Sequence, residues 1–523
     1  MAVEWNEGVL GRLLLTALVA AGCNGARGTV AIVDGGPLTP DAGARDAGPP
    51  DAGVADAGIA AAPDGGPTAS LPVSLPSGVA DWKFLGPAQG GPNTVNGASL
   101  DQGGNLWVAG DVDGLYLLRA GSQHYERFTL ADGLRPYGYM ADGSVPPGPK
   151  YLQVLSVSGA WAGTVFVGYA GRPPGAGEYD CESNWDGPSP DPSIYKSGDA
   201  DRVTLTATGI SVVHYDISSG PGLVPVELRG REKLCTIDRI RYDPAHDKVW
   251  FGANHGFAMG EAHYAGTANC IWDPTTDPPT PPQTSPFTNA YGHEGCSGVL
   301  EHVHPAINGY DNNTNNDCCQ YLTEDYFGVS VDPVTGDIWF GGLIRSTKFH
   351  YGVTNGDYYA AESQTEDPPY ISNRIDVWPD QVEEPNIPHP NQLVEDAISG
   401  AAAMNDGSVW LSSYSLGLAH VDASGNVIAR LTANDGLTST ELGSVVADPL
   451  DQSVWAGASW DGGISRLSGG QFTTYNDSVL GPDLIDQRVS DLQSFGTGPT
   501  RQIVASFLGD TKPAGAVAIY SGP

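Results

Sequence analysis

The residues with the greatest capacity for chemistry are histidines near the middle of the chain. His302 and His304 are separated by one residue, and if 300–304 is a strand, their side chains project from the same face. Two imidazoles on one face provide the geometry that a metal ion or an anionic ligand requires, and His255 could join them. In the competing interpretation these histidines lie at a loop surface or bond to backbone carbonyls. Both interpretations stay open at the level of sequence.

A second candidate site follows the histidines. The run Asp311–Asp317 offers alternating oxygen ligands at Asp311, Asn313 and Asn315, as at the start of a calcium loop. It lacks the glycine and the distant glutamate of the EF-hand pattern, so a polar turn is the alternative. Other catalytic patterns are absent from the sequence: there is no Gly-x-Ser-x-Gly elbow, no His-Glu-x-x-His and no phosphate-binding glycine loop.

The cysteines predict disulfides. Of the seven cysteines, six lie between positions 181 and 319, and an even set in an exported chain suggests pairing. A zinc site is the competing hypothesis, but no Cys-x-x-Cys spacing is present. The pairing is left open among Cys181, Cys235, Cys270, Cys296, Cys318 and Cys319.

The evidence for export lies at the N-terminus. Residues 13–22 form an apolar run that is too short to span a bilayer as a helix, so residues 1–22 are interpreted as a signal peptide. The segment Leu18–Cys23 resembles the lipobox of bacterial lipoproteins. The resemblance implies that Cys23 becomes the lipidated N-terminus and anchors the protein to a membrane of the cell envelope. An ordinary secretory signal with an incidental cysteine is the alternative.

The composition then changes abruptly. Residues 23–77 repeat a small unit of Asp, Ala, Gly and Pro that cannot supply a hydrophobic core, and they are predicted to form a disordered tether. The whole chain has 523 residues and a net charge of −36, which repels a phosphate backbone and excludes nucleic acid as a partner. Its 70 glycines and 41 prolines argue against a mostly helical protein.

A repeat organises residues 78–523. An aromatic residue flanked by apolar residues recurs six times, and a degenerate seventh copy has Val504 in its place. The copies usually follow a turn rich in Asp, Gly or Pro, and the clearest ones are followed by two more short strands. Four short strands per repeat predict an all-β, seven-bladed β-propeller, with residues 82–85 closing the ring against a last strand at 516–520. Two β-sandwiches and an eight-bladed propeller are the alternatives. The seven copies are 105–110, 164–168, 248–252, 337–341, 408–411, 453–457 and 502–505.

A family resemblance accompanies the repeat. Residues 128–134 and 431–437, each of which follows a fourth strand, resemble the linking segment of two-component-regulator propeller repeats, and 435–467 is the best match. Such repeats occur in periplasmic sensor regions, and similar seven-bladed propellers include the streptogramin lyases. The resemblance implies an extracytoplasmic propeller.

Three functions are compatible with these features. The first is a lipid-anchored propeller that binds a ligand or a protein, with long insertions in blades 2 to 4, at 172–200, 264–317 and 351–390, as its recognition surface. The second is a metal-assisted lyase or hydrolase with a site at the propeller channel, formed by the histidines named above. The third is a structural role in the envelope. The expected partners are the membrane, through the lipid, and a protein or a glycan that stacks on aromatic side chains.

Overall fold

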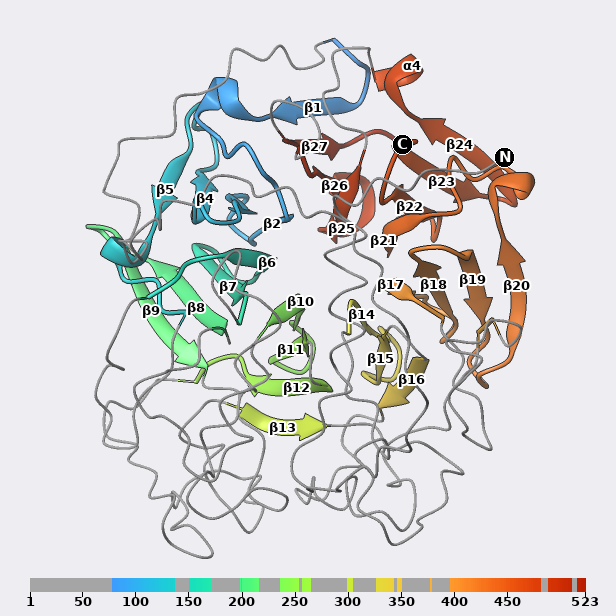
Figure 1. Cartoon of the computed structure of the whole chain (residues 1–523), viewed down its shortest axis with the longest axis horizontal. Coiled ribbons are helices and arrows are strands. Elements are labelled where there is room, and N and C mark those ends of the chain that lie inside the picture. Colours follow the sequence, from blue (N-terminus) through green and yellow to red (C-terminus); the bar gives the residue numbers. More distant parts are fainter. Residues whose placement is uncertain are drawn as a thin grey trace, which may run out of the picture.

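The strands of the molecule form seven separate antiparallel sheets arranged in a ring (Figure 1). Six sheets have four strands, and the sheet of blade 4 has three strands among the residues that the structure describes. The protein is therefore a β-propeller, and the prediction of an all-β fold is confirmed. This computed structural model describes residues 78–136, 150–171, 198, 200–215, 236–253, 256–264, 299–303, 326–342, 346–349, 377–378, 396–480, 488–509 and 515–523.

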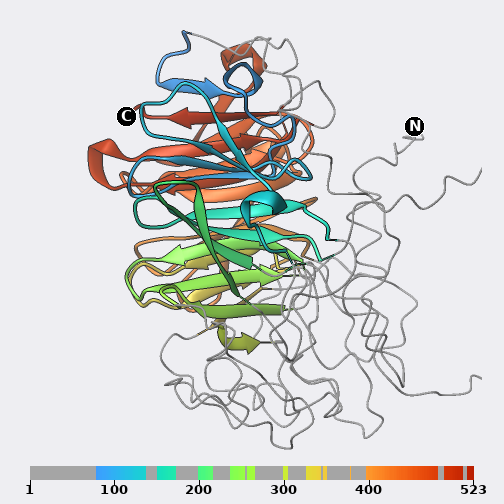
Figure 2. The same ribbon diagram turned by 90° about the vertical axis from the view of Figure 1, so that its left-hand side faces the viewer.

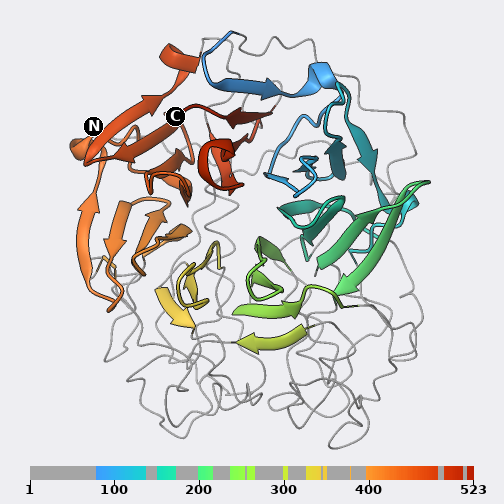
Figure 3. The same cartoon turned by 180° about the vertical axis from the view of Figure 1, so that it is seen from behind.

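In blades 1 to 6 the first strand lies at the centre of the ring, and later strands follow in chain order toward the rim (Figure 3). Blade 1 contains β2 (Gly97–Leu100), β3 (Leu106–Ala109), β4 (Leu115–Leu118) and β5 (Glu126–Phe128). Blade 2 contains β6 (Val154–Gly159), β7 (Thr164–Tyr169), β8 (Ala200–Leu205) and β9 (Ile210–Tyr215). Blade 3 contains β10 (Ile237–Asp243), β11 (Lys248–Ala253), β12 (Gly256–Glu261) and β13 (Val299–Val303).

Blades 4 to 6 repeat this order. Blade 4 contains β14 (Gly328–Val331), β15 (Ile338–Gly341) and β16 (Ser346–Phe349). Blade 5 contains β17 (Ile398–Ala403), β18 (Val409–Ser413), β19 (Gly417–Val421) and β20 (Val427–Leu431). Blade 6 contains β21 (Leu442–Ala447), β22 (Val454–Ala458), β23 (Ile464–Ser468) and β24 (Gln471–Tyr475), and a single helical turn, α4 (Asp477–Leu480), follows it.

Blade 7 closes the ring by combining both ends of the propeller. Its first three strands are β25 (Val489–Phe495), β26 (Gln502–Phe507) and β27 (Ala516–Tyr520), and its outer strand is β1 (Trp82–Leu85). In the β1–β27 pair Trp82 lies opposite Tyr520 and Leu85 lies opposite Val517. The predicted closing strand is thus confirmed. Figure 2 shows the ring edge-on, with β1 beside the C-terminal strands.

The core is divided among the seven junctions between neighbouring blades. Each junction, including that between blades 7 and 1, holds its own cluster of buried apolar side chains. The repeated aromatic residue of the second strand always faces the next blade, whereas its two apolar neighbours face the previous blade; Trp250 and its neighbours Val249 and Phe251 show this division. Because both faces of these strands are buried, the repeat is a continuous apolar run.

Serine side chains join the central strands to one another. At the junction between blades 5 and 6 the central strands approach closely, and a Cβ on Gly400 would lie 2.9 Å from the backbone nitrogen of Val445. At five other junctions a serine forms a hydrogen bond with the backbone of the next blade, which satisfies buried polar groups across the gap. The pairs are Ser99–Gly159, Ser156–Ile237, Ser330–Ala403, Ser444–Leu492 and Ser490–Val95.

The two segments that resemble propeller linkers form the same capped turn. In η2 (Leu130–Asp132) the Thr129 hydroxyl accepts a hydrogen bond from the backbone of Ala131, and the Asp132 carboxylate accepts one from the Thr129 backbone. The turn ends at Gly133, with φ of 105°, and delivers the buried side chain of Leu134 to the core between blades 1 and 2. The turn η6 (Ala433–Asp435) repeats this arrangement between blades 5 and 6.

Candidate functional site

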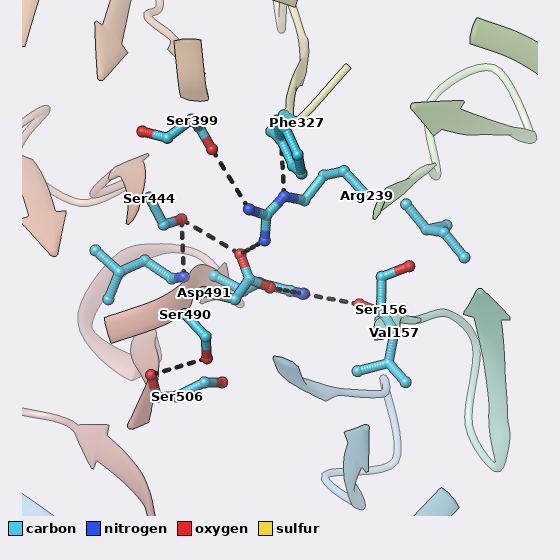
Figure 4. Close-up of polar contacts among 12 residues, drawn as sticks. Ser156, Val157, Arg239, Phe327, Ser399, Ser444, Ser490, Asp491 and Ser506 are labelled. Atoms are coloured by element: carbon cyan, nitrogen blue, oxygen red, sulfur yellow. Dashed lines mark hydrogen bonds and ion pairs between the residues drawn. The ribbon is translucent and has the colours of Figure 1, made fainter. Parts of the chain in front are cut away.

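A cluster of charged side chains lies where the seven central strands converge. In blades 3 and 7 the third residue of the central strand is Arg239 and Asp491. At the corresponding register position blades 2 and 6 have a serine and blades 1, 4 and 5 have a glycine. A β-bulge directly precedes both residues, between Ile237 and Arg239 and between Val489 and Asp491. Because a bulge redirects the side chain that follows it, the two charged groups point toward each other across the channel (Figure 4).

The Arg239 guanidinium is held on three sides. Its Nη1 lies 2.5 Å from Asp491 Oδ1, its Nε donates to the carbonyl oxygen of Phe327 at 3.0 Å, and its Nη2 lies 3.4 Å from the carbonyl oxygen of Ser399. The side chains of Arg239 and Asp491 are only 6% and 3% exposed. This buried ion pair links blades 3, 4, 5 and 7, so it fixes strands that lie far apart in the chain.

The Asp491 carboxylate gathers partners from further strands. Ser444 Oγ, from blade 6, donates to Asp491 Oδ1 at 3.3 Å. Gln493 Nε2 donates to Asp491 Oδ2 at 2.7 Å and to the carbonyl oxygen of Val157, in blade 2, at 2.8 Å. Both carboxylate oxygens are therefore occupied, and Asp491 is positioned to balance charge rather than to accept a proton from a substrate.

A second arginine, Arg241, lies two residues further along β10. Its Nη2 is 3.4 Å from Asp491 Oδ1, and its Nη1 donates to the carbonyl oxygen of Ile240 at 2.9 Å. The side chain is 20% exposed, more than Arg239 or Asp491. Burial lowers the pKa of Arg241, Asp491 raises it and the neighbouring Arg239 lowers it again. Two guanidiniums thus share one carboxylate, which leaves one positive charge in the channel.

This geometry defines what the channel can do. The ion pair crosses the channel at the level of Arg239, and the remaining positive charge favours an anion over a metal cation there. The Ser444 hydroxyl donates to Asp491 and accepts a hydrogen bond from the backbone of Leu492, and that carboxylate is itself held by Arg239 and Gln493. The cluster joins blades 2 to 7 through buried polar contacts.

A serine, a histidine and an aspartate also meet in blade 5. Ser408 Oγ lies 2.8 Å from His420 Nε2 and donates to Asp406 Oδ1 at 2.6 Å, and the His420 ring stacks on Trp410. The serine proton points to the carboxylate and not to the imidazole, which is the reverse of a catalytic triad. Burial lowers the pKa of His420.

In neighbouring blades a cationic side chain takes the place of His420. In blade 6, Arg466 lies over Trp455 and bonds to Ser453 and Asp451. In blade 4, a lysine lies over the equivalent tryptophan and pairs with an aspartate. His420 is therefore one member of a structural series that covers the repeated tryptophan, by ring stacking in blade 5 and by cation–π contacts in blades 4 and 6.

The predicted histidine site is only partly within the described residues. His302 lies in β13 and pairs with Ala258 of β12, so the predicted strand exists. β13 is the outermost strand of blade 3, whereas the channel is lined by β10. His255 and His304 lie outside the described residues. Across the described ranges no three His, Cys, Asp or Glu side chains are grouped to hold a metal ion.

The other predicted sites also fall outside the described residues. These are the lipid-attachment residue Cys23, the six cysteines between 181 and 319, and the loop of Asp311, Asn313 and Asn315. Lipid attachment, disulfides and a calcium site therefore stay predictions. No helix in the described part of the chain is long and apolar enough to cross a membrane.

The channel cluster was not among the sites predicted from the sequence. A signal was present: Arg239 and Arg241 alternate in a central strand at positions where other repeats carry small residues. Nothing in the sequence near Asp491 relates it to two arginines some 250 positions away. Only the ring brings them together.

Comparisons with known proteins add a structural likeness. No family model and no curated protein matches the chain. The chain is similar to a chain in the crystal structure of the mitotic checkpoint complex, with 10% identity, a TM-score of 0.43 and coverage of 94% of this chain and 99% of that one. It is also similar to YCF48 bound to D1 peptide, with 12% identity, a TM-score of 0.42 and coverage of 86% and 100%. A third likeness is to the WD40 β-propeller domain of Doa1, with 10% identity, a TM-score of 0.39 and coverage of 82% and 94%. The fold assignment rests on the strand topology above.

Proposed function

We propose that this protein is a binding module, a β-propeller held at the cell envelope by a lipid on Cys23, which recognises a ligand or a protein outside the cytoplasm. The observation that carries the proposal is a closed ring of seven sheets whose central polar groups, within the described part of the chain, are engaged with one another. Such a scaffold holds its surface loops in fixed positions at little cost in conformational entropy on binding.

The two faces of the ring provide a direct test of binding. Successive strand connections alternate between the two faces of the ring. Trp460 lies in the connection between the second and third strands of blade 6, and Val334 lies in the connection between the first and second strands of blade 4. The two residues are therefore on opposite faces. Both side chains are exposed, at 40% and 65%. A photo-crosslinking amino acid placed at each position in the full chain should capture a defined partner from one face only. Failure to form a specific adduct from either face would argue against a binding function.

Membrane attachment has a separate test. Cys23→Ser in the full chain should move the protein from the detergent phase to the aqueous phase in Triton X-114 partitioning, because the thioether that carries the lipid is lost. Cys181→Ser is the matched control and should leave the partitioning unchanged. Identical partitioning of the wild type and Cys23→Ser would exclude lipid attachment at this residue.

The alternative function, a metal-assisted lyase or hydrolase, is favoured by no observation within the described residues. It predicts a stoichiometric divalent metal in the purified protein that is lost in His302→Ala and His304→Ala. Elemental mass spectrometry of the three proteins measures this directly.

A further inference from the structure

The charges of the channel cluster do not balance. Arg239 and Arg241 contribute two positive charges, and Asp491 contributes one negative charge. Arg239 holds the carboxylate at 2.5 Å, whereas Arg241 reaches the same oxygen only at 3.4 Å, beyond the usual range of a charge-assisted hydrogen bond. Arg241 is therefore the weaker partner in a shared ion pair.

No other counter-charge is placed at Arg241 among the residues that the structure describes. Asp491 is the one acid there within ion-pair distance of the Arg241 guanidinium, and Arg239 opposes the Arg241 charge. A largely buried guanidinium without a full counter-charge is costly, which favours uptake of an anion from solvent.

The position of Arg241 gives an anion access. Its side chain is 20% exposed, and it lies beyond Arg239 toward the turn at 243–248, which joins the first two strands of blade 3. At the neighbouring level Arg239 and Asp491 pair with each other, and their side chains are only 6% and 3% exposed. A ligand would therefore enter from the end where the turns between first and second strands lie, and would stop at Arg241.

We propose that Arg241 forms a binding site for a carboxylate group at this end of the channel. The excess charge is +1, which one carboxylate neutralises, whereas a phosphate dianion would leave a negative charge in a largely desolvated site. A planar carboxylate also matches the two-pronged edge of a guanidinium. This inference deepens the proposed binding function by naming the chemistry of the ligand, and it rests on that function for its biological meaning.

The test uses the purified full-length protein and sodium acetate as the probe. Saturation-transfer NMR on the acetate methyl group, at constant ionic strength, should show binding with a dissociation constant in the millimolar range, about what one charge-assisted bidentate contact provides. Arg241→Gln should weaken binding by about tenfold or more. Arg119→Gln is the matched control, because Arg119 is an exposed arginine already paired with Glu126, and it should bind acetate like the wild type.

Further arms keep the test decisive. Arg241→Lys keeps the charge but loses the two-pronged edge of the guanidinium. This variant should fold and should bind acetate several-fold more weakly than the wild type does. It takes the place of Arg241→Gln in the test if the glutamine variant unfolds. Acetate binding that is equal in the wild type and the Arg241 variants would overturn the site, as would no binding to the wild type. Inorganic phosphate that binds more tightly than acetate would overturn the preference for a carboxylate. None of these outcomes depends on capturing a partner, so failure here is distinct from failure of the crosslinking experiment.

Discussion

Replacing Asp491 with asparagine tests whether the channel cluster holds the ring together. The side chain keeps its shape and loses its charge, so Arg239 and Arg241 lose their shared counter-ion inside the molecule. The new amide also places a donor against the donor of Gln493 if it takes the position of Oδ2, 2.7 Å away. The substitution therefore removes charge and hydrogen bonding together.

The expected cost follows from the burial of the pair. Breaking a buried ion pair costs about 3–5 kcal/mol. We expect about 3 kcal/mol, the lower end, because the asparagine oxygen can still accept from Arg239 and because the 20% exposure of Arg241 lets water solvate part of its charge.

Urea unfolding of the full chain, followed by tryptophan fluorescence, measures this free energy. The exposed pair of Arg119 and Glu126, whose side chains are both 43% exposed, provides the control, and Glu126→Gln should cost less than about 1 kcal/mol. In a double-mutant cycle, Arg239→Met combined with Asp491→Asn should cost less than the sum of the single changes. Each single change leaves one buried charge without its partner, whereas the double change removes both charges of the pair. The reasoning is refuted if Asp491→Asn unfolds within about 1 kcal/mol of the wild type, as the control does.

Three further predictions address ring closure, the close approach of blades and pH dependence. Trp82→Ala should cost about 3–5 kcal/mol in urea unfolding, because the Trp82 ring is buried in the aromatic cluster of blades 6 and 7. Val334→Ala, at a side chain that is 65% exposed, should change little, and equal effects would contradict the role of β1 in closure. Gly159→Ala should cost about 1–3 kcal/mol, because its Cβ would overlap the backbone of Leu100 in the preceding blade. A Cβ on Gly97 meets its nearest neighbour at an ordinary 3.5 Å, so Gly97→Ala is the control in the same assay. Burial lowers the pKa of His420, so below its unfolded pKa of about 6.5 the unfolded chain binds the proton more readily and the contribution of His420 to stability is lost as pH falls. His420→Gln should therefore show a smaller loss of melting temperature than the wild type between about pH 7.5 and 5.5, and an unchanged loss would exclude this group as the cause.

The sequence by itself determined the architecture of the propeller. The repeated aromatic strand carries its own evidence, since a run such as Val249–Phe251 is apolar on both faces only because both faces are buried between blades. The closing strand at Trp82–Leu85 was predictable for the same reason: a ring must end where it begins, and an apolar segment stood at each end of the repeat region. The turn at Thr129–Leu134 was predictable from its motif because the capping contacts are local in sequence.

The channel site was decided only by the tertiary structure. A strand period of two assigns residues to the faces of a blade, but the bulges before Arg239 and Asp491 shift that alternation, and they arise from strand pairing rather than from a sequence pattern. Which residues then meet depends on seven central strands converging on one axis, which brings together groups separated by 252 positions. The same convergence places His302 on the rim side of blade 3, because radial position is set by the order of strands within a blade and not by distance along the chain.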